Sequence, residues 1–347
     1  MIEGAWDTIS KSASMVLEYV LSPEKRLFVG YLVSAALIAR WVYRRSGQTN
    51  TFLSYLFPRR IWLSSSARVD YQLVVLNSFI KVSLLSAFLV YGLHLASWVD
   101  GSLTRYFGPS ERSLSLTTTL LTYTVLVTVI GDLSVYWVHR LMHRVPMLWA
   151  IHQVHHSAET LTPVTQLRLH PLELVISTAR SLLVFGALAG LFRYLSDHQI
   201  GLMTFLGVNL FSFFFFSLGA NLRHSHVRLR YWHPVEHLFI SPLQHQIHHS
   251  TAPEHQHRNF GSKLAVWDWL FGTLATSRNT GRLKFGLSPF DHRPQTLSDA
   301  LMTPLRVWKQ GLKQKLKPRV LRQQSRADEK VLKGGLGHSP TCDAPSP

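Results

Sequence analysis

Three short motifs hold most of the histidines that could do chemistry in this chain. HRLMH spans residues 139–143, IHQVHH spans residues 151–156 and QHQIHH spans residues 244–249. Within each motif the histidines are spaced so that a short helix would present two or three imidazoles to one side. Imidazole nitrogen binds Fe, Cu, Zn and Ni alike. The motifs therefore predict a metal site without choosing the metal.

The number of imidazoles indicates more than one metal ion. A closed tetrahedral zinc site needs four ligands, and the three motifs supply twice as many. The one cysteine lies at position 342, in the tail, so the ligands must be nitrogen and oxygen. Two ions, each with an open position for oxygen or water, would use the whole set. The predicted motif ligands are His139, His143, His152, His155, His156, His245, His248 and His249.

The composition is typical of a membrane protein. Hydrophobic residues make up 46% of the chain and charged residues only 16%, against about 25% charged in soluble proteins. Lys and Arg (36) outnumber Asp and Glu (19). A nucleic-acid-binding protein would have a higher total charge, so we expect no nucleic acid partner. Basic flanks beside apolar stretches point instead to anionic lipid.

Apolar stretches long enough to cross a bilayer need roughly 20 residues as helix. Five stretches approach or exceed this length, which predicts an all-α, polytopic membrane helix bundle of about five spans. The short link between the last two predicts a tight helical hairpin. The predicted spans are residues 27–43, 71–99, 114–138, 172–192 and 199–220.

Charge asymmetry gives these spans an orientation. Residues 40–68 hold six arginines, whereas residues 97–113 hold two arginines and two acids. By the positive-inside rule, the first segment faces the cytoplasm. Counting crossings from there brings all three histidine motifs to the cytoplasmic face. We therefore predict an integral, multi-pass protein of a bacterial inner membrane or the endoplasmic reticulum, with its active site on that face.

The pattern H-x3-H, H-x2-H-H and H-x2-H-H between apolar spans resembles the fatty acid hydroxylase / sterol desaturase superfamily of membrane di-iron oxygenases. DLSVYWVHRLMH, LWAIHQVHHS, LRHSHVRL, ISPLQHQIHHS and NFG…LAVWDWLFGTL carry the resemblance. It covers residues 114–275, which we take as a di-iron domain. The N-terminal region, 1–113, would hold two spans. The basic C-terminal tail, 276–347, is expected to be partly disordered.

The resemblance implies two iron ions as cofactors, O2 as co-substrate and the eight motif histidines as ligands. Members usually have a further histidine or two between the second and third motifs. His224 and His226 match that position, and the sequence leaves open which of them is the additional ligand.

Two acids in predicted spans need partners, because an ionised group at membrane depth is unfavourable. Asp132 lies seven residues before His139, two helical turns away and on the same side. We expect Asp132 to hydrogen-bond a ligand imidazole, with a Thr or Arg of the bundle as the alternative partner. The same expectation applies to Glu173. His170 and Pro171 are expected to begin the fourth span.

The implied activity is O2-dependent hydroxylation or desaturation of a C–H bond in a membrane lipid, either fatty acyl, sterol or related. No dinucleotide fingerprint, iron–sulfur motif or haem attachment motif is present in the sequence. We therefore expect an external electron donor, either a redox protein or a reduced pterin. The basic segment 306–333 could dock an acidic partner, lie on anionic headgroups or be solvated. The oligomeric state stays open.

Two functions of other classes remain as alternatives. A membrane zinc hydrolase would use a Glu base in H-E-x-x-H, which none of the motifs contains. A non-catalytic metal-binding or transport protein would hold its ligands at the bilayer midplane, whereas these motifs lie beyond the ends of the predicted spans.

Overall fold

The computed structural model describes residues 2–85, 88–110, 113–196, 204–205, 208–288 and 294–316. The chain divides into two compact units, Met1–Thr303 and Pro304–Pro347. Every predicted site residue lies in the first unit. Residues 317–347, which include most of the predicted basic tail segment, lie outside the described residues.

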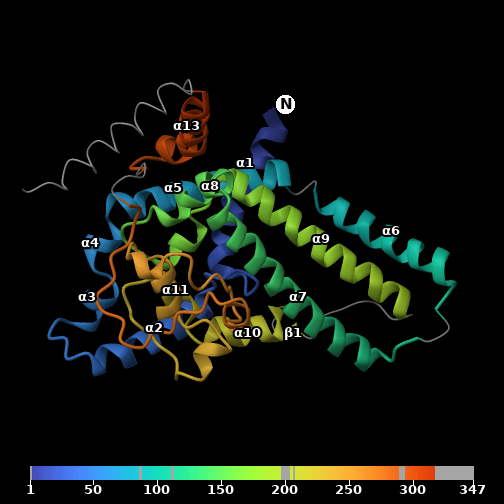
Figure 1. The fold of residues 1–347 in the computed structure, drawn as a ribbon, viewed down its shortest axis with the longest axis horizontal. Helices are drawn as coiled ribbons and strands as arrows, with labels where there is room; N and C mark the ends of the chain where they lie inside the picture. Colours follow the sequence, from blue (N-terminus) through green and yellow to red (C-terminus); the bar gives the residue numbers. More distant parts are fainter. Residues whose placement is uncertain are drawn as a thin grey trace, which may run out of the picture. The chain divides into compact units, whose positions relative to one another are not determined.

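The described chain is almost entirely helical, as predicted (Figure 1). The α-helices are α1 (Ile2–Leu21), α2 (Val29–Arg45), α3 (Phe52–Leu56), α4 (Arg59–Trp62), α5 (Ser65–Ile80), α6 (Leu89–Phe107), α7 (Leu116–Arg144), α8 (Pro146–His156), α9 (Pro171–Leu195), α10 (Leu210–Ser217), α11 (Pro242–His248), α12 (Val266–Leu270) and α13 (Leu297–Leu316). A π-helical turn, η1 (Lys81–Leu85), follows α5. Short 3₁₀ turns are η3 (Pro163–Leu167), η4 (Ala220–His224), η5 (Val235–His237) and η6 (Pro253–His255). Strands β1 (Thr204–Phe205) and β2 (Val208–Asn209) form a two-stranded antiparallel pair.

Two helices in the described part of the chain, α7 and α9, are long and apolar enough to cross a membrane. A bent pair, Ser65–Leu84 with Leu89–Phe107, would make a third span if it crosses as one unit. The first predicted span corresponds to α2, which has only 17 residues. The structure thus supports two or three spans, and the prediction of five is not confirmed.

The predicted fifth span, 199–220, departs furthest from expectation. Residues 197–203 and 206–207 lie outside the described residues, and the described remainder holds the short strands and α10. Helix α10 has 8 residues, far fewer than a span needs. The Asn209 side chain caps its start by accepting from the Ser212 N–H, and Gly219 follows its end at φ 86°. Across the described residues, the helical hairpin predicted here is wrong.

Helix α9 packs instead along α6, where small residues let the two backbones approach closely. A Cβ on Gly186 would lie 2.8 Å from the Gly92 carbonyl oxygen, and one on Gly190 would lie 2.5 Å from that of Ala96. Pairs of small residues four apart allow this packing in membrane helices. On another side α9 packs against α7. Figure 1 shows the three long helices running side by side.

A buried ion pair anchors α8, which carries the second histidine motif. The Arg168 side chain is fully buried and donates to the Asp70 carboxylate of α5 at 2.8 Å. It also donates to the backbone carbonyl oxygens of Val154 in α8 and Ser66 in α5. A charge pair is tolerated here because its remaining donors are satisfied. Arg168 therefore fixes α8 against α5.

Candidate metal centre

The first histidine motif lies at the end of the long helix α7, and the other two lie on the short helices α8 and α11. His139 and His143 lie in the last two turns of α7. Helix α8 starts with Pro146 at its first position, where proline needs no hydrogen-bond partner for its nitrogen. Helix α11 begins at a capping box, in which Ser241 and Gln244 each accept from the other's backbone N–H.

The structure gathers nine histidines into two adjacent sets. In each set the candidate ligand atoms all lie within 4.8 Å of one another. The imidazole of His156 in the first set stacks on that of His249 in the second, with ring centroids 4.5 Å apart. The five-histidine set is His139, His143, His152, His156 and His248. The four-histidine set is His155, His224, His245 and His249.

The doubled histidines explain why H-x-x-H-H occurs twice. Neighbouring residues on a helix point about 100° apart, so an H-H pair sends one ring to each set. His156 joins the five-histidine set and His155 the four-histidine set; His248 and His249 are divided in the same way. Helix α8 thus gives two imidazoles to the first set and one to the second. Helix α11 together with His249, the residue that caps its end, gives one to the first and two to the second.

Partners on Nδ1 fix the orientation of three rings in the five-histidine set. His139 Nδ1–H donates to the Phe260 carbonyl oxygen at 2.8 Å, and His248 Nδ1–H donates to that of Arg258 at 2.7 Å. His152 Nδ1 lies 2.9 Å from the Glu173 carboxylate. Such contacts fix the tautomer of metal-bound histidine and raise its basicity. They leave Nε2 as the nitrogen free to bind metal.

All five Nε2 atoms of this set are buried and have no hydrogen-bond partner among the described residues. Buried polar atoms are rarely left unpaired, so five in one place require an explanation. A metal ion is one, since it would accept all of these lone pairs at once. The donor set fits.

The four-histidine set has a different arrangement. Its Nε2 atoms point at one another: His224 lies 3.1 Å from His245 and 3.1 Å from His249, and His245 lies 3.2 Å from His249. Each neutral Nε2 is either a donor or an acceptor, so three mutual neighbours cannot all be paired. A shared cation removes the conflict. Metal–nitrogen bonds of about 2.1 Å place neighbouring ligand nitrogens roughly 3.0–3.4 Å apart.

Burial keeps the histidines outside the long helices in the neutral form that a metal needs. It lowers the pKa of His248 to about 3, and it lowers the pKa of His155, His156, His224, His245 and His249 well below the ordinary value. Nearby imidazoles and, for His224, the Arg223 guanidinium add to this effect. At neutral pH no proton competes for these ligand atoms.

The structure separates the two histidines between which the sequence could not choose. His224 ends η4 and belongs to the four-histidine set. His226 belongs to neither set, and its ring packs edge-on against Tyr55 with centroids 5.1 Å apart. The 3₁₀ turn η4 ends at His224, and the next residue, Ser225, is extended at φ −158°, so His226 lies outside the helical turn. The expectation that His226 joins the metal ligands is not supported.

Asp132 does not contact an imidazole in the described structure, contrary to expectation. Its carboxylate accepts from the backbone N–H groups of Lys263 and Leu264 and from Trp267 Nε1. Glu173, the other acid considered, makes the contact to a ligand ring. Asp132 therefore holds the loop that follows Phe260, rather than a histidine directly.

Asp268 supports the same loop from its other side. Its carboxylate accepts from the backbone N–H groups of Phe260 and Gly261 at 2.8 Å and 2.7 Å. The loop must stay in place because the Phe260 carbonyl orients His139. Burial raises the pKa of Asp268 to about 6. The sequence alone does not reveal this role, because the link between Asp268 and a ligand runs through the backbone of Phe260.

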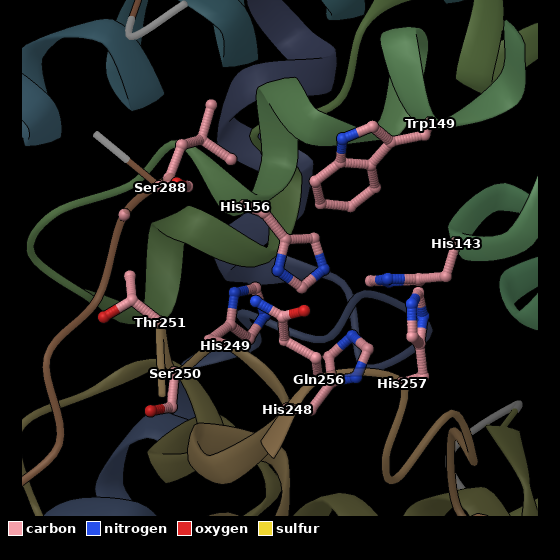
Figure 2. Close-up of a pocket in the computed structure, with 12 residues that line it drawn as sticks. His143, Trp149, His156, His248, His249, Ser250, Thr251, Gln256, His257 and Ser288 are labelled. Atoms are coloured by element: carbon pink, nitrogen blue, oxygen red, sulfur yellow. The ribbon is translucent and has the colours of Figure 1, made fainter. Parts of the chain in front are cut away.

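A polar cavity of about 280 Å³ opens beside four imidazoles (Figure 2). Figure 2 shows His143, His156, His248 and His249 gathered around one space, with Trp149 next to His156. Sequence reasoning missed Trp149, Gln256 and His257, which also line this cavity. No spacing pattern links them to the motifs.

A second cavity, of about 310 Å³, opens on the other five imidazoles. Besides these rings it is lined by Arg26, Arg180 and Arg223 and by apolar side chains of α7. A third, apolar cavity of about 620 Å³ is lined partly by Phe211, Phe214 and Phe215 of α10, and no histidine lines it. The phenylalanine block therefore does not open onto the metal ligands.

The sequence pattern of the fatty acid hydroxylase family matches residues 124–273, the region that contains both histidine sets. This stretch, which is less than half of the chain, is similar to the fatty acid hydroxylase family. The matched region begins within α7, ends after α12 and contains every residue of the two sets.

Curated relatives agree with this assignment. The ornithine lipid hydroxylase OlsE of Rhizobium tropici is 31% identical over 154 residues, which cover 43% of this chain and 41% of that protein. Alkylglycerol monooxygenase of Homo sapiens is 29% identical over 157 residues, covering 45% and 31%, and that of Danio rerio is 30% identical over 148 residues, covering 42% and 28%. The chain therefore spans less than half the length of these relatives. No solved structure matches the chain.

Proposed function

We propose that this protein is a membrane-embedded, O2-dependent lipid hydroxylase that holds two iron ions, one in each histidine set. The observation that carries the proposal is the convergence of nine imidazoles into two adjacent sets whose inward-facing nitrogens lack protein partners. The resemblance to membrane di-iron oxygenases supports iron as the metal, and the fatty acid hydroxylase match supports a lipid as the substrate. Relatives named as a hydroxylase and as monooxygenases support hydroxylation over desaturation.

The reaction has a fixed balance. A lipid C–H bond, O2, two electrons and two protons give a C–OH bond and one water. Bound iron would supply the activation of O2. The protein's own groups hold the ligands, since Glu173 and two backbone carbonyls orient three rings. Phe260 packs against His139, His143 and His248 and limits water beside the five-histidine set.

Electrons must come from outside the chain. We propose that the donor, a redox protein or a reduced pterin, approaches the polar cavity beside His143 and His257, and that this cavity faces the cytoplasm. Its lining includes Ser, Thr, Gln and His side chains, and it reaches imidazoles of both sets. The lipid would then use the second cavity, whose apolar residues come from the long helix α7.

The proposal is tested by lipid profiling of cells that express the wild type or His155→Ala. His155 is buried in the four-histidine set, so we expect the hydroxylated lipid to disappear in the variant and in wild-type cells without O2. His94→Ala is the matched control, because His94 is exposed on α6. Purified wild type should hold about two iron ions. Zinc in place of iron, with lipid changes that do not need O2, would contradict the proposal and favour a hydrolase.

A further inference from the structure

The cavity that opens on His139, His152, His155, His224 and His245 has a cationic wall. Three arginines from distant parts of the chain form it: Arg26 in the loop before α2, Arg180 in α9 and Arg223 in η4. Arg26 is exposed, Arg180 is half-buried and Arg223 is 4% exposed. The wall therefore runs from the open side of the cavity to its buried end.

Few carboxylates oppose these charges. Within the described residues His152 pairs with Glu173 and Arg168 pairs with Asp70, whereas Arg26, Arg180 and Arg223 have no carboxylate within ion-pair distance there. Two acids lie near the arginines. Glu173 lines the cavity and contacts His152 Nδ1. Asp132 acts on Arg223 electrostatically, and backbone and indole N–H groups already bind its oxygens.

A fourth cation feels the same excess of positive charge. Burial and the charges of the three arginines lower the pKa of Lys263 to about 8, although the Asp132 carboxylate acts in the opposite direction. Excess positive charge held beside a cavity favours an anionic occupant.

The guanidinium groups also have N–H donors to spare. Arg180 donates to Ser134 and Ser181, and Arg223 donates to the carbonyl oxygens of Ala220 and Ser262. The guanidinium of Arg26 stacks over Phe216 and makes no hydrogen bond within the described part of the chain. Each guanidinium has more donors than these contacts use. Arg180 lies in α9, one of the two described helices that are apolar enough to cross a membrane, where arginine is rare and marks a functional site.

We propose that this cavity binds the oxyanion of a lipid headgroup, a phosphate or a carboxylate, and so presents a carbon near that headgroup to the metal centre. This rests on the proposed hydroxylase function. Planar guanidinium groups bind both oxyanions through paired hydrogen bonds. A volume of about 310 Å³ is at the lower limit for ligand sites. It holds a headgroup and a few carbons, whereas a two-chain lipid must keep its tails outside.

The test is equilibrium binding of three radiolabelled single-chain lipids to the purified full-length protein in neutral detergent. Oleoyl lysophosphatidate carries a phosphate, N-oleoylglycine carries a carboxylate and monooleoylglycerol is uncharged. We expect at least one oxyanion lipid to bind roughly ten- to a hundredfold more tightly than monooleoylglycerol, as charge-assisted hydrogen bonds would give. The tighter of the two identifies the anion as phosphate or carboxylate.

Arginine variants test whether the preference for oxyanion lipids arises in this cavity. Arg180→Gln and Arg223→Gln should remove most of it and leave monooleoylglycerol binding unchanged, while Arg180→Lys should keep part of it. Arg193→Gln is the matched control, because Arg193 lies on the same helix but is exposed. Iron content equal to that of the wild type shows that each variant is folded.

Equal binding of the three lipids by the wild type would overturn the inference, and so would an equal loss of preference in Arg193→Gln. Iron content and O2-dependent lipid oxidation are measured on the same preparations. A protein that oxidises lipid but binds the three probes equally contradicts the headgroup inference alone. Absence of any O2-dependent oxidation contradicts the proposed function instead.

Discussion

The two histidine sets lie side by side but are prepared for metal in different ways. In the five-histidine set, Phe260, Arg258 and Glu173 hold three Nδ1 atoms, and all five Nε2 atoms are unpaired. In the four-histidine set, the Nε2 atoms crowd together, and the Nδ1 atoms of His155, His245 and His249 are buried without a hydrogen-bond partner in the described structure.

This difference indicates which histidine set needs a bound metal ion to keep its geometry. The protein's own hydrogen bonds fix ring orientation in the five-histidine set, so it should keep its shape without metal. The four-histidine set places nitrogens together that repel unless a cation lies between them. Its geometry should therefore form fully only with metal bound, which couples binding there to local folding.

The largest predicted effect comes from removing one ligand from the smaller set. His224→Ala leaves three imidazoles and should reduce iron from about two ions per chain to about one, with activity lost roughly a thousandfold. His143→Ala leaves four imidazoles in its set and should keep nearly two ions. Metal analysis and lipid oxidation on both variants check this. Equal metal loss in the two variants would contradict the claim that the four-histidine set tolerates the loss of a ligand less well than the five-histidine set.

A smaller effect is expected from the carboxylate that orients His152. Glu173→Gln keeps the shape but removes the charge that stabilises the ring, and should weaken metal affinity or activity about 10- to 100-fold. Glu254→Gln, at an exposed position in η6, is the matched control. Iron titration of the two apoproteins measures the change. If the two variants bind iron alike, Glu173 does not support the site.

Much of the candidate metal centre could be predicted from the sequence. Spacing of three and four residues located the motif histidines on helix faces, and counting them predicted two ions. The spacing could not show whether His224 or His226 joins the motif histidines, because this depends on where η4 ends. It ends at His224, and the chain is extended at Ser225. The partners of Asp132 lie more than a hundred residues away. Hydropathy alone also overestimated the span at 199–220, since it ignores the Asn209 cap and Gly219.

Acid should lower the stability of the folded apoprotein at both sets, because burial lowers the pKa of their histidines. His248 in the five-histidine set and His249 in the other both have a lowered pKa. Below pH 6.5 the unfolded apoprotein binds protons at these positions, whereas the folded apoprotein stays neutral at His248 down to about pH 3. Stability is therefore lost as pH falls, by about 2 kcal/mol for His248 between pH 7 and pH 5.

Thermal or denaturant unfolding of the apoprotein in detergent measures this loss. His248→Gln should show a shallower fall in stability between pH 7 and pH 5 than the wild type. A slope that does not change would mean that His248 is not kept neutral by burial.

The smallest effect is expected at His226. His226→Gln changes a side chain outside both sets, so iron content should stay at the wild-type value and activity should change less than about threefold. Loss of one iron ion in this variant would place His226 among the ligands and contradict the assignment of His224 as the additional one.

Anomalous diffraction at the iron edge, from crystals of the full-length protein loaded with iron, tests the central claim most directly. We predict two peaks. One lies within bonding distance of the five-histidine set, and the other lies within bonding distance of His155, His224, His245 and His249. A single peak, or iron bound away from these imidazoles, would contradict the account.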